Sequence, residues 1–121
     1  MEFSNERPIY LQIMDLIIQQ ILSKQLLPGA KIPAVRSLAL ELETNPNTVQ
    51  RALQELERET ILYTQRGKGR FVTENQELLA RLAANQRQEL MEEYLKKMQE
   101  IGIEPKAALR QLQTYIEGGN S

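Results

Sequence analysis

Apolar residues recur at helical spacing in the first half of the chain. After a short polar lead at residues 1–6, one stripe repeats every three or four positions and ends at the Leu-Leu-Pro-Gly turn of residues 26–29: Ile9, Ile13, Leu16, Ile17 and Ile21. A shorter stripe follows it: Val35, Leu38, Ala39 and Leu42. Because such a stripe normally faces a core, the pattern predicts two helices that pack against the rest of a small domain.

A third helix is predicted to begin at Pro46. The side chain of Asn45 can cap free backbone N–H groups, and proline fits the first helical position because it has no N–H to satisfy. The apolar face of this helix consists of Val49, Ala52, Leu53 and Leu56. Only Glu43 and Thr44 separate it from the helix before, and this connection is short enough for a helix-turn-helix.

The apolar period changes from helical to alternating after Glu59. Residues 61–65 and 70–72 have the alternation of β-strands, and the Arg-Gly-Lys-Gly run of residues 66–69 between them is typical of a hairpin turn. The glycines permit positive φ, and three cations lie on or beside the tip: Arg66, Lys68 and Arg70. Such a tip suits a phosphate-lined groove.

Two further helices are predicted at about 76–100 and 105–116, with Gly102 and Pro105 between them. Each carries an apolar stripe. Two helices cannot cover stripes this long against each other alone, so we expect half of a symmetric dimer interface. The alternative is that the long helix packs back on the N-terminal domain. The residues expected in the interface are Leu79, Leu82, Leu90, Met91, Tyr94, Met98, Leu109, Leu112 and Ile116.

The charge distribution is uneven although the chain is nearly neutral. The net charge of −1 over 121 residues argues against a uniformly basic nucleic-acid-binding surface. Residues 31–72 nevertheless hold seven basic and five acidic side chains, whereas residues 73–121 hold six and eight. The positive excess therefore lies in the helix-turn-helix and the hairpin.

The residue types argue against an enzyme, a metal site and a cofactor. Histidine and cysteine are absent, so the chain has no near-neutral acid or base, no thiol nucleophile and no disulfide. Glu55, Glu57, Glu59 and the pair at 92–93 are interpreted as solvated helix faces, because no oxygen-ligand loop accompanies them. No apolar run approaches a membrane span, and residues 1–10 lack the order of a signal peptide, so we expect a soluble, cytoplasmic protein.

Side chains suited to DNA lie near the start of the third predicted helix. Asn47, Thr48 and Gln50 can reach base edges or phosphates in a major groove, and glutamine can pair bidentately with adenine. Arg36 projects opposite to the apolar stripe of the preceding helix and could meet a guanine edge or the backbone. Arg51 is either a backbone contact or a helix-surface charge.

Three runs carry a family resemblance: PAVRSLA at 33–39, NPNTVQRALQELE at 45–57 and RGKGRFV at 66–72. They closely resemble the winged helix-turn-helix of GntR-family bacterial transcription regulators. The second run, with the short C-terminal part, resembles the YtrA-like branch most. The resemblance implies DNA contacts at Arg36, Asn45, Asn47, Thr48, Gln50, Arg66 and Gly67. The chemistry of the residues themselves adds Arg51, Lys68 and Arg70.

The chain departs from the family pattern at several positions. Ala34 stands where a Ser or Thr cap is usual, and Glu43 and Thr60 replace common glycines. These three changes affect helix ends and turns. Pro46 and Gln50 stand where other branches often carry arginine, so the operator sequences of those branches do not transfer to this chain.

The sequence therefore predicts a mainly α fold with a small β-hairpin. A winged helix-turn-helix DNA-binding domain is expected at 1–73 and a two-helix dimerisation hairpin at 74–121. The expected function is sequence-specific regulation of transcription by a homodimer that binds a palindromic double-stranded DNA operator. The resemblance to the YtrA-like branch, whose members are commonly repressors, implies repression. The alternative is a winged-helix protein-interaction module without DNA specificity. About 49 residues follow Val72, so a small-molecule effector would bind at the dimer interface, if one binds this chain at all.

Overall fold

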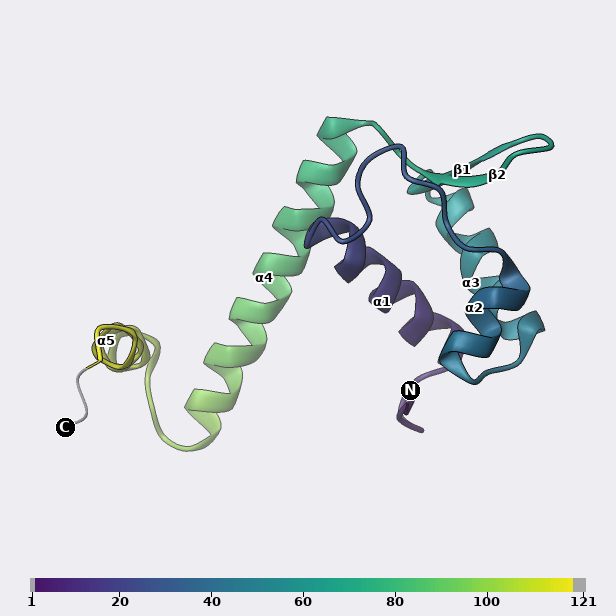
Figure 1. Ribbon diagram of the computed structural model, residues 1–121. Helices are drawn as coiled ribbons and strands as arrows, with labels where there is room; N and C mark the ends of the chain where they lie inside the picture. The colour runs from purple at the N-terminus through teal and green to yellow at the C-terminus, as the bar shows by residue number, and fades with distance from the viewer. Residues whose placement is uncertain (1, 119–121) are drawn as a thin grey trace. The chain divides into compact units, whose positions relative to one another are not determined.

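The computed structural model describes residues 2–118, and this range holds five helices and one two-stranded sheet (Figure 1). The chain divides into two compact units, with the boundary inside the fourth helix between Arg81 and Leu82. The elements in chain order are α1 (Ile9–Leu22), α2 (Val35–Leu42), α3 (Pro46–Arg58), β1 (Leu62–Gln65), β2 (Gly69–Val72), α4 (Gln76–Glu100) and α5 (Pro105–Ile116). The mainly helical fold with a small hairpin is as expected from the sequence.

The core of the first unit forms where α1 and α2 pack on α3. The predicted apolar faces supply it, and its fully buried large side chains are Ile13, Ile17, Val49, Leu53, Leu56, Ile61, Leu62 and Val72. Since α3 lies between the other elements, its buried face fixes the position of its polar face.

The C-terminal ends of α2 and α3 both use a left-handed residue that is not glycine. Glu43 has φ of 53° and Thr60 has φ of 61°. After α3, the N–H of Ile61 donates to the carbonyl of Leu56 and the N–H of Thr60 donates to Glu57, each at 2.9 Å. This is the hydrogen-bond pattern of a Schellman motif, which here leads the chain directly from α3 into β1.

The hairpin pairs β1 with β2 in antiparallel register, with Leu62 opposite Val72 and Thr64 opposite Arg70. In Figure 1 it extends beyond the helices of its unit. The segment before α2 runs along β2 as well, because Lys31 forms an isolated bridge with Phe71. The N–H of Ile32 donates to the carbonyl of Arg70 at 2.8 Å. The base of the hairpin is thus held on both edges of β2.

The second unit is a helical hairpin made by the rest of α4 and by α5. Gly102, with φ of 84°, ends α4, and the N–H of Ile103 donates to the carbonyl of Met98 at 2.9 Å. Ala108 of α5 is fully buried, whereas many larger apolar side chains of this unit are exposed. An apolar groove runs between the two helices, lined by Leu90, Met91, Tyr94, Leu95, Pro105, Lys106, Leu109 and Leu112.

Candidate nucleic-acid interface

The N-terminal end of α3 presents the polar residues expected to touch DNA. The Asn45 side chain accepts a hydrogen bond from the N–H of Asn47 at 2.7 Å, and Pro46 occupies the first turn, as predicted. Asn47 is exposed, while Thr48 and Gln50 are half-buried. The remaining free N–H groups and the helix dipole favour an anion such as phosphate at this end.

Two arginines flank this helix end from different directions. Arg36 projects from α2 and is exposed. The guanidinium of Arg51 lies over the ring of Tyr10, 3.8 Å from its centroid. This cation–π contact, worth roughly 0.5–1 kcal/mol at an exposed site, ties Arg51 to α1. This role of Tyr10 cannot be predicted from the sequence, because no local pattern links residues 41 positions apart.

The wing, residues 62–72, places exposed Arg66, Gly67 and Lys68 at its tip. Gly67 has φ of +79°, with open space where a side chain would lie. Lys31 also belongs to this surface and was missed in the sequence. A Cβ atom at Gly69 would lie 3.1 Å from Cε of Lys31, so the lysine side chain passes directly across the wing.

Arg70 is engaged within the protein. Its Nε donates to Oε1 of Glu57, and Nη1 approaches Oε1 of Gln50 at 3.5 Å. Burial alone would raise the pKa of Glu57, but hydrogen bonds from Arg70 and Thr64 and the guanidinium charge outweigh it and lower that pKa. Glu57 is therefore not the solvated surface charge expected from the sequence. It joins α3 to both strands of the wing.

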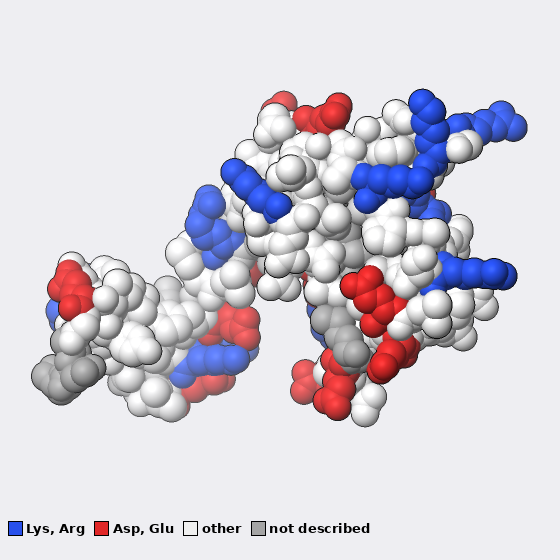
Figure 2. Space-filling model, viewed as in Figure 1, with Lys and Arg blue, Asp and Glu red and all other residues white. Residues whose placement is uncertain are grey.

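Several basic side chains of the first unit gather at the wing. Figure 2 shows Lys and Arg side chains projecting from the region of the wing, at the upper right of the view. A cleft beside the wing runs to the start of α2, and its cationic lining residues are Lys31, Lys68 and Arg70. A helix with a polar N-terminal end and a basic wing in one unit are suited to DNA, because the helix end can enter a groove while the wing contacts phosphates.

Comparison with known proteins agrees with this geometry. The family model described as "Bacterial regulatory proteins, gntR family" matches residues 9–72. The HTH-type transcriptional regulator YhcF of Bacillus subtilis is 41% identical over 118 residues, which is 98% of each chain. This chain belongs to the GntR family. Its members regulate transcription by binding DNA, so the prediction that the protein is not an enzyme is confirmed.

Other GntR relatives extend the likeness. The transcriptional repressor YtrA of Bacillus subtilis is 47% identical over 68 residues, about half of each chain. A solved GntR-family regulator from Listeria monocytogenes has a TM-score of 0.84 at 35% identity, covering 93% of this chain and 98% of that one. The DNA-binding domain of AraR, solved with operator ORX1, has a TM-score of 0.55 at 27% identity over 60% of this chain and 93% of its own.

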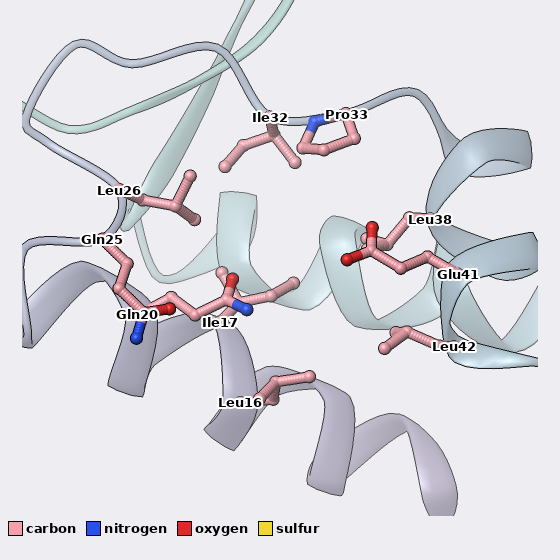
Figure 3. A pocket seen from close by; sticks show the side chains of 10 residues that line it. All are labelled: Leu16, Ile17, Gln20, Gln25, Leu26, Ile32, Pro33, Leu38, Glu41 and Leu42. Carbon is pink, nitrogen blue, oxygen red and sulfur yellow. The ribbon is translucent and has the colours of Figure 1, made fainter. Parts of the chain in front are cut away.

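Apart from this interface and the apolar groove of the second unit, the described part of this GntR chain holds a small cavity in the first unit. Among residues 2–118 there is no cluster of three or more potential metal ligands and no helix that could cross a membrane. A cavity of about 220 Å³ lies between α1, α2 and the segment joining them, with Gln20, Gln25 and Glu41 around an apolar floor (Figure 3). It is smaller than the roughly 300–1,000 Å³ usual for ligand pockets.

Proposed function

We propose that this protein is a homodimeric repressor that binds a palindromic operator. The N-terminal end of α3 enters the major groove, and the wing lies along the adjacent groove. Residues 1–73 bind DNA and residues 74–121 dimerise, with the protein acting in the cytoplasm, where a bacterial chromosome lies. The observation that carries the DNA-binding part is the joint exposure of Asn47, Arg36 and the wing tip on one unit.

The dimer is supported by the apolar groove of the second unit. Leu90 is 62% exposed, Met91 52% and Leu109 65%, and all three line this groove. Soluble proteins rarely leave a contiguous apolar surface of this kind uncovered. A second copy of the same hairpin offers a matching surface, since a two-fold interface uses the same residues on both partners.

Selection of random double-stranded DNA by the purified protein tests this function. At about 150 mM salt, a physiological ionic strength, we expect enrichment of an inverted repeat. Two half-sites would reflect the two-fold symmetry of the dimer. If a folded dimer enriched no sequence, DNA-specific regulation would give way to a protein-interaction role, whose binding would be insensitive to salt.

Substitutions at the interface should separate base reading from phosphate binding. Arg36→Ala and Gln50→Ala should each lose about 1–3 kcal/mol of discrimination at one base pair of the operator. Lys68→Ala should instead weaken binding to all duplexes alike. It should also reduce the slope of log affinity against log salt concentration by about one, the loss expected for one phosphate contact. Titrations with operator and scrambled DNA at several salt concentrations measure both effects. Unchanged operator preference in Gln50→Ala would remove that residue from base reading.

A further inference from the structure

Three side chains form a chain of contacts between the wing and the recognition face of α3. Arg70 of β2 donates from Nε to Glu57 and from Nη1 to Gln50, the latter over 3.5 Å. Gln50 and Glu57 are seven residues apart on α3, which is about two turns and places them on one face. Arg70, which belongs to the wing, therefore contacts α3 at two residues about two helical turns apart.

The Glu57 end of this chain is firmly held. Its carboxylate accepts a hydrogen bond from Nε of Arg70, and Thr64, which helps to lower the pKa of Glu57, lies opposite Arg70 in the hairpin. The side chains of Arg70 and Glu57 are only 19% and 29% exposed. A partly buried, charge-assisted pair of this kind keeps its geometry better than a surface ion pair. Arg70 is thus fixed before any DNA arrives.

Arg70 decides which atom of Gln50 faces the groove. A guanidinium only donates hydrogen bonds, so the amide oxygen of Gln50 faces Arg70 and uses one of its two lone pairs there, which turns the oxygen toward the wing and leaves the amide nitrogen as the group better placed to bind a base. Bidentate pairing with adenine needs the glutamine oxygen to accept from N6 while the nitrogen donates to N7. Guanine presents two acceptors, O6 and N7, in the same groove. A glutamine that presents its amide nitrogen to the groove, with its oxygen turned to Arg70, fits guanine better than adenine.

We propose that Glu57 and Arg70 are positioning residues that make Gln50 a hydrogen-bond donor, and so set its preference to guanine over adenine. This inference rests on the proposed function, because it requires α3 to read bases. It assigns Arg70 a role in specificity in place of a direct phosphate contact. It also makes Glu57, an acidic residue on a DNA-binding helix, a determinant of the operator.

The test compares operators selected by the wild-type chain and by the double variant Glu57→Gln/Arg70→Met. The double variant removes both charges together, so no unpaired charge remains in the half-buried site. At the base pair that Gln50→Ala identifies as its contact, we expect guanine in the wild type. The variant should raise the adenine-to-guanine affinity ratio about tenfold, within the range for one bidentate base contact. In the Gln50→Ala background the same double change should leave the ratio unaltered.

A matched control uses the other Arg–Glu pair of α3. Arg58 and Glu55 interact at 3.5 Å, and the Arg58 side chain is 77% exposed. Glu55→Gln/Arg58→Met changes the same residue types but should leave the ratio at the wild-type value. Arg70→Lys serves as a second test that keeps the positive charge beside Glu57. A lysine lacks the fork that reaches two acceptors, so this variant should also gain adenine binding.

Three results would overturn the inference. The first is an adenine preference in the wild type, the second is an unchanged ratio in both Arg70 variants, and the third is a shift that persists without Gln50. Failure of the wild type to select any operator would instead remove the proposed function itself. Thermal melting of each variant confirms that the compared proteins are folded.

Discussion

Leu109→Glu is expected to produce a folded monomer that binds its operator at least about 100-fold more weakly. Leu109 lines the apolar groove of the α4–α5 hairpin and is 65% exposed, so a single chain tolerates the charge. Two copies facing each other would bury two unpaired carboxylates at their contact. Losing the dimer loses the second half-site, and linked binding is worth roughly 100- to 10,000-fold in affinity.

Sedimentation and operator titration measure the two parts of this result. Gln111→Glu is the matched control, because it adds the same charge to an exposed position of α5 that lies on the opposite side of the helix from Leu109 and does not line the groove. It should sediment as the wild type does. Affinity for a single half-site should be the same for both variants and the wild type. A wild-type monomer at tens of micromolar would instead favour packing of the long helix on its own chain.

Leu56→Ala is expected to lower the free energy of unfolding by about 2–5 kcal/mol, the range for a buried leucine truncated to alanine. Leu56 is 0% exposed in the core between α3 and its neighbours, and its carbonyl also accepts the N–H of Ile61 at the start of the wing. The side chain therefore supports the position of α3, and its removal leaves a cavity. Urea denaturation followed by circular dichroism measures the loss.

Leu40→Ala makes the same chemical change at a site without packing. Leu40 lies on α2 and is 80% exposed, so its truncation should change stability by no more than about 0.5 kcal/mol. Equal losses in the two variants would contradict the assignment of Leu56 to the core.

Local signals in the sequence were sufficient to predict the positions of the helices and strands. The Asn45 cap with Pro46 located the start of α3, and the change from helical to alternating period located the hairpin. Gly102 and Pro105 gave the limits of the last two helices, where the observed bounds match the expected ones. These features are set within a few residues of chain, so pattern and capping preferences decide them.

The sequence did not reveal the contacts that connect those elements. Lys31 reaches the surface of the wing through a bridge to Phe71, and Tyr10 receives Arg51 from another helix. Glu57 is one of three glutamates at alternating positions, and only the fold brings Arg70 to it. Each pairing depends on how separate elements pack, for which spacing along the chain carries no signal.

The short Schellman connection between α3 and the wing has a mechanical consequence. The two parts proposed to meet DNA, α3 and the wing, are joined by a tight turn and linked by the Glu57–Arg70 pair, which restricts the distance between them. A protein with such a restricted spacing between its two DNA-contacting elements is sensitive to the width of the groove. It would favour sequences whose groove width matches that distance, because deforming mismatched DNA costs free energy even at base pairs that no side chain touches.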